Sequence, residues 1–558
     1  MMPSREFSAD GNLTRKSPEP MPEASPNPQA TPLAGGLWPY EEAAKLTERV
    51  ASYELGRPVI FESGFGPSGL PHLGTLAEVL RPSYVQQALQ QIEPSRPSRL
   101  IVFIDDMDGL RKVPENVPNR ERMNAHLGKP VSRIEDPFGD GHSSFADHMI
   151  AQLGAFLAPV EVDYELIMSS KMYLSGGFDE ALKLILKKHR EIIALVAPTL
   201  REENRQGWSP FMPVCPNCGQ VNSTLVTAYH PDRATVEFSC ERTSGGAHGC
   251  GFKGEQTVLG GNTKVQWKVD WALRWYVLKV DYELYGKDLT DSVRLSEPIV
   301  RLLGGQPPLG FPFEMFLDEQ GRKVSKSVGR GVTAEQWQRY APIEVLKFFL
   351  LINPRRARKL FLDAIPQYVD EYLDALREYA ARDHETQTNS PLGFVLQNKS
   401  PRRFESELSF AMMMNLVAAL GSSDRDFLWS YLTRYDAAIA GYAETEAMGR
   451  ALMDCALNFY RDFIEPTKQQ YAPVVAERKQ LQVLSNWLQE HPHASAEEIE
   501  KRIYDLGRAN YDKPGKIFPL LYRSILGQER GPRLGAFVRL ATPARVVELL
   551  NAAIARVA

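Results

Sequence analysis

The fold is decided by residues 57–75, which read RPVIFESGFGPSGLPHLGT. The apolar run Arg57–Ser63 breaks at Gly64–Pro67, which is typical of a buried strand that enters a loop. After the loop, leucines recur at helical spacing from Leu73 until Pro82. The stretch therefore predicts a strand, a glycine-rich turn and a helix.

A second strand-like run, Arg99–Ile104 (RLIVFI), ends in the acidic loop 105–112. Strands that alternate with helices favour a parallel sheet, whose ligands bind beyond the carboxyl ends of the strands. Loops 62–72 and 105–112 both follow such ends. We therefore expect an α/β nucleotide-binding fold of the Rossmann type.

The composition is that of a globular protein with real cores. The 558 residues are 43% hydrophobic and 24% charged, and the formal net charge of −4 excludes a polybasic nucleic-acid coat. No apolar run approaches the ~20 residues of a membrane-spanning helix. Charge is uneven, however, because residues 501–558 hold 11 Lys and Arg against 4 Asp and Glu. This basic segment is suited to face a phosphate backbone.

The helix that follows the first loop has a start suited to phosphate. Its unpaired N–H groups and positive dipole end favour an anion. His72 can donate to a phosphate oxygen, and Gly74 lets backbone or ligand approach closely. The alternative is a simple strand–turn–helix corner in which His72 only caps the helix.

A second anion-binding segment lies some 250 residues later, at Gly321–Gly329 (GRKVSKSVG). Glycines at both ends predict a mobile loop, and two lysines with two serine hydroxyls make it a clamp for an anion. The alternative is a solvated basic loop. The pairing of this loop with a His-x-Gly helix start favours the functional interpretation.

These two motifs resemble the signatures of class I aminoacyl-tRNA synthetases, HLGT at residues 72–75 and KVSKS at residues 323–327. Further segments resemble the class I lysyl-tRNA synthetase family, which is archaeal and also found in some bacteria. They cover roughly residues 38–390 and comprise 62–69 (ESGFGPSG), 105–114 (DDMDGLRKVP), 136–139 (DPFG) with His142 and His148, 267–275 (WKVDWALRW) and 286–288 (GKD). The chain departs from the family at Gly66, where Thr is frequent, and at Leu289, where His is common.

The resemblance implies a lysine–tRNA ligase that uses ATP, Mg²⁺, L-lysine and tRNA(Lys). It implies catalytic roles for His72, Gly74, Lys323, Ser325 and Lys326, and ATP binding by Pro67, His72, Gly74, Lys326 and Asp288. Lysine is activated without an enzyme nucleophile, so catalysis rests on positioning and on charge neutralisation at phosphate oxygens. We expect a cytoplasmic monomer that does not bind membranes.

Recognition of lysine requires a carboxylate for its ammonium group and an apolar or aromatic wall for its methylenes. Asp270, with Trp267 and Trp271 on either side, supplies both kinds of group. Glu62 at the end of the first strand is the alternative carboxylate, and Gly64 is expected to present its backbone to the amino acid. The residues do not decide between Asp270 and Glu62.

Four cysteines within 36 residues point to a metal in a reducing compartment. They follow the spacing Cys215-x2-Cys218-x21-Cys240-x9-Cys250. The first pair is typical of a zinc knuckle, the second spacing is longer than usual, and His248 competes as a ligand. We expect structural Zn²⁺ on the four cysteines; the alternative is a ribbon without metal.

The coarse map has six segments. They are a disordered tail (1–36), two halves of a catalytic domain (37–207 and 259–331) around the cysteine module (208–258), a helical connector (332–390) and a helical anticodon-binding domain (391–558). Two other functions stay open. A glutamyl-tRNA synthetase would need cationic groups in the pocket, and a non-catalytic RNA-binding paralogue would have no need of intact signature motifs.

Overall fold

The computed structural model describes residues 36–54, 56–139, 141–322, 333–397, 404–468 and 471–556. The tail expected over residues 1–36 therefore lies outside the described residues, apart from Gly36. So do Lys323, Ser325 and Lys326 of the predicted anion clamp. None of the described helices combines the length and apolarity needed to cross a bilayer.

A parallel four-stranded sheet organises the first half of the chain. Its strand order is β11-β1-β2-β3, where β1 is Val59–Phe65, β2 is Ser98–Ile104, β3 is Glu165–Met168 and β11 is Tyr282–Glu283. All three pairings are parallel, and Glu62 of β1 is in register with Glu283 of β11. The expected parallel α/β sheet is confirmed. β1 runs two residues further than the apolar run because Gly64 and Phe65 still pair with β2.

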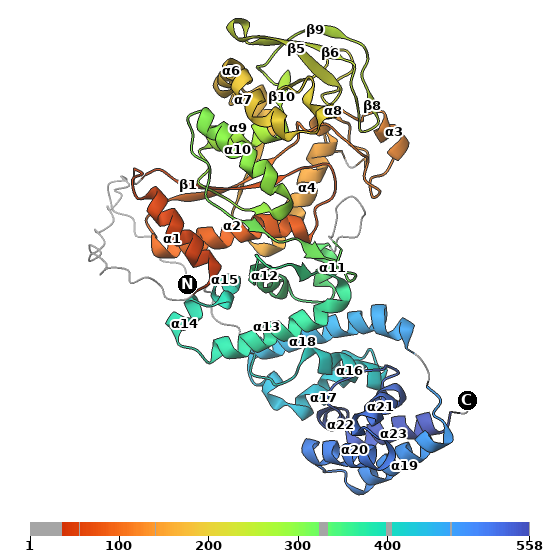
Figure 1. Ribbon diagram of the computed structural model, residues 1–558. Helices are drawn as coiled ribbons and strands as arrows, with labels where there is room; N and C mark the ends of the chain where they lie inside the picture. Colours follow the sequence, from red (N-terminus) through yellow and green to blue (C-terminus); the bar gives the residue numbers. More distant parts are fainter. Residues whose placement is uncertain are drawn as a thin grey trace, which may run out of the picture. The chain divides into compact units, whose positions relative to one another are not determined.

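Helices cover both faces of this sheet. Alternate residues of β1 and β2 enter two separate cores: Phe61 and Val102 belong to one, Ile60 and Phe103 to the other. The first core packs against α1 (Trp38–Val50), α2 (Leu73–Ile92) and α4 (Phe145–Leu157), and the second against α6 (Asp179–Lys187), α7 (His189–Val196), α9 (Trp267–Leu278) and α10 (Thr290–Leu302). Figure 1 shows α1 and α2 on one side of β1 and α9 and α10 on the other.

Helix α2 is longer than its leucine pattern predicts. It continues through Pro82 to Ile92, although proline removes a backbone donor and disfavours a helix interior. The residues after Pro82, including Tyr84 and Val85, are fully buried in the same core as Leu76. Tertiary packing therefore outweighs the local cost of the proline.

The cysteine segment forms a small antiparallel β module. Its three-stranded sheet contains β5 (Thr224–His230), β6 (Thr235–Cys240) and β9 (Lys253–Thr257), with a hairpin of β7 (Thr243–Ser244) and β8 (Ala247–His248). At its base, β4 (Phe211–Pro213) pairs with β10 (Thr263–Val265). This pairing joins the two ends of the insertion, so the chain re-enters the catalytic fold near the point where it left it.

Short elements complete the first half and lead into the helical part. They are α3 (Arg120–Asn124), α5 (Ser169–Leu174), α8 (Glu202–Arg205), β12 (Tyr285–Gly286), which pairs with β13 (Pro312–Phe313), and β14 (Phe316–Leu317), which pairs with β15 (Arg358–Lys359). β15 is a two-residue strand inside the segment expected to be a helical connector.

The rest of the described chain is helical, as the sequence predicts. The α-helices are α11 (Ala334–Gln338), α12 (Ile343–Leu351), α13 (Ile365–Ala380), α14 (His384–Thr388), α15 (Pro391–Leu396), α16 (Phe410–Leu420), α17 (Arg425–Tyr435), α18 (Ala443–Phe459), α19 (Val475–Glu490), α20 (Ala496–Asn510), α21 (Ile517–Ile525), α22 (Leu534–Ala541) and α23 (Pro543–Ile554). Cys455 of α18 is buried among apolar side chains, as expected of a core cysteine.

Candidate active site

The turn after β1 and the start of α2 form a tightly capped corner. His72 is the N-cap of α2, and its Nδ1 accepts hydrogen bonds from the backbone N–H groups of Gly74 (2.9 Å) and Thr75 (3.2 Å). A Cβ at position 74 would lie 2.5 Å from Cε1 of His72, so the imidazole ring itself requires glycine there. The structure thus shows the capping role of His72, and contact with phosphate stays a prediction.

A cavity of about 620 Å³ lies at the carboxyl ends of β1 and β2, where the parallel sheet predicts a ligand site. Its lining comes mainly from residues within the segments 63–69, 105–114, 267–274 and 283–292. Of the predicted site residues, Gly64, Pro67 and Trp267 line this cavity. The described residues Glu62, His72, Gly74, Asp270 and Asp288 do not belong to the lining.

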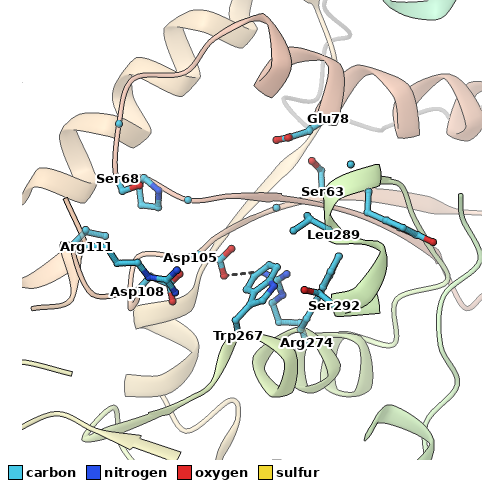
Figure 2. A pocket seen from close by; sticks show the side chains of 18 of the residues that line it. Ser63, Ser68, Glu78, Asp105, Asp108, Arg111, Trp267, Arg274, Leu289 and Ser292 are labelled. Carbon is cyan, nitrogen blue, oxygen red and sulfur yellow. Dashed lines mark hydrogen bonds and ion pairs between the residues drawn. The ribbon is translucent and has the colours of Figure 1, made fainter. Parts of the chain in front are cut away.

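Arg274 of α9 is completely buried and joins two carboxyl groups of neighbouring strands. Its Nη1 donates to Oδ1 of Asp105 at 2.8 Å, and its Nε lies 3.2 Å from Oε1 of Glu62. Asp105 and Arg274 both line the cavity. Figure 2 shows them joined beside Trp267, with Asp108 and Arg111 to one side and Leu289 and Ser292 to the other.

Burial dominates the electrostatics of these carboxyl groups. It raises the pKa of Asp105 to about 7, although Arg274 opposes the rise. Burial and then the neighbouring Glu283 hold the pKa of Glu62 well above its ordinary value. Arg274 and Asp105 thus pair within one wall of the cavity, which also contains Trp267, Trp271 and Glu283 and is called the wall below.

Asp270 lies behind the wall. Its side chain is 1% exposed, and its Oδ1 accepts the hydroxyl proton of Tyr173 at 2.7 Å. The same hydroxyl oxygen accepts the backbone N–H of Val265 at 3.1 Å. Asp270 thus ties α9 to β10 and α5, whereas Trp267 and Trp271, one helical turn apart, face the cavity.

Three residues of the wall were not among those singled out from the sequence: Asp105, Arg274 and Glu283. Asp105 directly follows β2, and a polar residue at the end of a parallel strand is a signal that could have identified it. Arg274 stands in a segment that carries the family resemblance. Glu283 belongs to a two-residue strand, and no periodicity or spacing in the sequence marks it.

Asp288 does not line the cavity, and most of the second anion-binding segment lies outside the described residues. Asp288 belongs to a 3₁₀ turn, Lys287–Leu289, and its Oδ1 lies so close to Gly286 that a Cβ there would be 2.7 Å away. Gly286 and Leu289 line the cavity. The described chain stops at Arg322 and resumes at Thr333, which caps α11, so the KVSKS segment lies outside it.

The four predicted metal ligands lie together. Their Sγ atoms all lie within 4.8 Å of one another, with Cys215 to Cys250 at 3.6 Å and Cys218 to Cys240 at 3.7 Å. Four thiolates at about 2.3 Å from one Zn²⁺ in a tetrahedron stand about 3.8 Å apart, so this set fits zinc. His248 is not part of the group; it pairs with Thr243 in the β7–β8 hairpin.

The cysteine module supports one wall of the cavity. Val221, three residues after Cys218, donates its N–H to the carbonyl of Gly128 at 2.7 Å. Gly128 in turn donates to the carbonyl of Leu110 at 2.8 Å, beside the lining residues Gly109 and Arg111. A metal in the module would therefore stabilise the loop that forms this side of the cavity.

Fold and site define an α/β nucleotide-binding protein of the class I synthetase type: a parallel sheet, a cavity at its carboxyl ends and a helix that starts with His-x-Gly. Residues 36–398 match the family model described as tRNA synthetases class I (K). The chain belongs to this family.

Comparison with curated proteins gives relatives of the same class. The chain is 38% identical over 525 residues to a lysine–tRNA ligase of Rickettsia bellii (strain OSU 85-389), covering 92% of this chain and 97% of the relative. It is 39% identical to a lysine–tRNA ligase of Rickettsia prowazekii (strain Madrid E), covering 91% and 95%. A solved glutamate–tRNA synthetase from Elizabethkingia anophelis aligns over 90% of this chain and 100% of its own, with 12% identity and a TM-score of 0.39.

Proposed function

We propose that this chain is a lysine–tRNA ligase, which activates L-lysine with ATP to lysyl-adenylate and transfers lysine to tRNA(Lys). Its family and the names of relatives that share 38% identity over 92% of the chain support the proposal. The structural observation that carries it is the cavity wall, where Trp267 and Trp271 stand beside buried carboxyl groups. Such a wall suits a long aliphatic side chain that ends in a cation.

The wall does not suit glutamate. A pocket for a γ-carboxylate needs a free cationic group, and the guanidinium of Arg274 already contacts Asp105 and Glu62. The other cations of the lining are Arg111 and Lys112 in the loop after β2. Figure 2 shows Arg111 on the same side of the cavity as Ser68, away from Trp267.

The protein contributes to this reaction mainly by positioning the two substrates. The lysine carboxylate attacks the α-phosphorus of ATP in line, the bond to the β-phosphate oxygen breaks, and pyrophosphate leaves. In the proposal, Gly64 and Pro67 border the substrates, and His72 and Gly74 hold the start of α2 at the triphosphate. Asp288 acts beside the adenosine.

The proposal also gives roles to the predicted anion clamp and to two buried carboxyl groups. Lys323, Ser325 and Lys326 neutralise the leaving pyrophosphate together with Mg²⁺ that arrives with ATP. Glu62 and Asp270 act on the lysine pocket from behind the wall, where Arg274 and Tyr173 hold their carboxyl groups. As in other class I enzymes that the sequence resembles, the aminoacyl group then moves to the 2′-hydroxyl of the terminal adenosine.

The proposal includes the organisation of the chain. The catalytic halves 37–207 and 259–331 enclose the module 208–258, whose four cysteines would hold one structural Zn²⁺. Residues 332–390 connect to a helical domain, 391–558, that binds the anticodon region. We place the enzyme in the cytoplasm, since four free thiols at a metal site suit a reducing compartment. We also propose that it is a monomer.

Amino-acid-dependent exchange of pyrophosphate into ATP tests this function. Lysine should support exchange, arginine poorly, and glutamate not detectably. Exchange driven by glutamate would instead favour the glutamyl enzyme, and absence of exchange with every amino acid would favour a non-catalytic RNA-binding paralogue. Charging of tRNA(Lys) by the same preparation completes the test.

A further inference from the structure

We propose that Glu283 selects the amino-acid substrate by binding the terminal ammonium group of its side chain. This inference rests on the proposed function and adds the residue that decides specificity. Three features of the molecule support this role: the position of Glu283, its charge and the aromatic surface beside it.

Glu283 is held at the cavity by its backbone and its side chain. Its N–H donates to the carbonyl of Leu309 at 2.9 Å, and a Cβ at Gly310 would lie 1.9 Å from its carbonyl oxygen. Its side-chain Oε2 accepts the indole N–H of Trp271 at 2.9 Å and also that of Trp275. The residue is 4% exposed and lines the cavity.

The second oxygen of Glu283 is left for a ligand. Oε1 accepts no hydrogen bond from the described residues, yet it is not among the fully enclosed polar atoms of the structure. Two indole donors on one oxygen fix the orientation of the carboxylate, so Oε1 is the atom that meets the cavity. This is an unpartnered acceptor on a side chain more than nine-tenths buried.

Glu283 has no ion-pair partner of its own among the described residues, and Arg274 acts on its charge without forming a salt bridge with it. Within the described part of the chain, no lysine, arginine or histidine nitrogen forms an ion pair with it, whereas Asp105 pairs with Arg274 and Asp108 with Lys264. A buried carboxylate without a cation is unfavourable. A ligand that brings its own cation relieves this cost, and an acidic or neutral side chain does not.

Two other carboxyl groups near the cavity fit this role less well. Glu62, the register neighbour of Glu283, faces Arg274 and is absent from the lining. Glu78 belongs to α2, and Figure 2 shows it on the opposite side of the cavity from Trp267 and Arg274.

An aromatic surface leads to Glu283. Trp267 stacks on Trp271 with ring centroids 5.0 Å apart, and Tyr285 meets Trp271 edge-on at 6.3 Å. All three rings line the cavity. Aromatic faces bury methylene groups and attract cations. The ligand that this surface and Glu283 fit is an unbranched aliphatic chain with an ammonium at its end.

The pKa of Glu283 gives supporting evidence. Burial raises this pKa, and Arg274 and the two indole donors oppose the rise. An ammonium group beside Oε1 would lower it further. Binding of lysine is therefore expected to favour the ionised carboxylate.

The decisive variant is Glu283→Gln, which keeps the volume and an oxygen for the indoles but removes the charge. We expect the lysine KM in pyrophosphate exchange to rise at least about 100-fold, since loss of one partner of a buried charge pair has effects of this size. The ATP KM should stay within about threefold. Preference for lysine over norleucine, which lacks only the ammonium group, should fall by the same factor as lysine affinity.

The wild-type enzyme separates this inference from the proposed function. If glutamate rather than lysine drives wild-type exchange, the function itself is wrong. If lysine drives it and Glu283→Gln keeps the wild-type preference for lysine over norleucine, only the role of Glu283 is wrong.

A second variant keeps the test valid if Glu283→Gln does not fold. Trp275→Phe removes one of the two donors to Oε2 and retains an aromatic ring. It should raise the lysine KM about 3- to 10-fold and move the pH dependence of that KM upward, because a hydrogen bond to the ionised carboxylate is lost. An unchanged lysine KM with an unchanged pH profile would overturn the proposal.

Discussion

The guanidinium of Arg274 donates to Oδ1 of Asp105 at 2.8 Å and thereby joins α9 to the end of β2 in the interior of the protein. The same group lies 3.2 Å from the carboxyl group of Glu62 at the neighbouring strand. Arg274 is therefore the cation that allows two acidic residues to stand at one sheet edge beneath the cavity.

Loss of this cation should destabilise the protein strongly. Arg274→Gln leaves Asp105 buried without its partner, which typically costs about 3–5 kcal/mol. The midpoint of unfolding in urea should fall accordingly. As a control, Arg301→Gln breaks an exposed pair with Glu297 on α10 and should cost ~0–1 kcal/mol. Equal effects of the two changes would contradict the structural role of Arg274.

Lysine binding should weaken as the pH falls through the pKa of Asp105. Burial raises this pKa to about 7, with Arg274 and Lys264 opposing the rise and Asp108 and Asp270 adding to it. A cationic substrate favours ionised Asp105, so the lysine KM should increase below about pH 7 and level off above it. KM measured from about pH 6 to 8.5, for wild type and Asp105→Asn, checks this.

The raised pKa of Asp105 has the opposite effect on folding: a higher pH favours lysine binding but lowers the stability of the ligand-free protein. Folded Asp105 keeps its proton up to about pH 7, whereas an unfolded aspartate releases it near pH 4. This group therefore makes the ligand-free protein less stable as the pH rises from about 4 to about 7.

The Asp105→Asn variant tests the prediction for lysine binding. If it retains the wild-type pH dependence of the lysine KM, another group is responsible for that dependence.

Lys326→Ala should slow adenylate formation while leaving the fold intact. Loss of one charge partner of the reacting phosphate typically lowers the rate ~10²–10³-fold. Single-turnover measurement of adenylate formation checks this, with Lys183→Ala on the exposed surface of α6 as a matched control. A variant within about threefold of wild type would remove Lys326 from the mechanism.

Metal analysis should find close to one zinc per chain. Cys215→Ala or Cys218→Ala should lose the metal and make residues 208–258 the first site of proteolysis, since such modules depend on zinc for folding. Cys455→Ala should retain the metal, because Cys455 lies on α18, buried among apolar side chains. Metal-free wild-type protein with a protease-resistant module would contradict the zinc assignment.

Charging of tRNA should depend on the basic segment, residues 501–558. Lys501 and Lys513 are exposed there, so Lys501→Glu with Lys513→Glu should reduce tRNA charging and leave pyrophosphate exchange unchanged. Charging by the wild type should also fall steeply with salt, because phosphate contacts release counterions. If charging by the double variant and its salt dependence equal those of the wild type, tRNA binds elsewhere.

The sequence by itself determined the features that depend on neighbouring residues. His72 and Gly74 are two positions apart, so the helix cap and the need for glycine beneath the imidazole ring are local. The spacing Cys215-x2-Cys218 is local in the same way, and short continuous apolar runs identify the strands of the sheet because parallel strands are buried on both faces. The class of fold and the cysteine cluster follow from such patterns.

Only the tertiary structure decided which acidic residues face the cavity. Asp270, between two tryptophans in the sequence, points to the hydroxyl of Tyr173, 97 residues away. Glu283 reaches the cavity because β11 pairs beside β1 and two indole groups orient its carboxylate. The direction of a side chain and the cation that balances its charge depend on segments distant in sequence. No spacing pattern reports them.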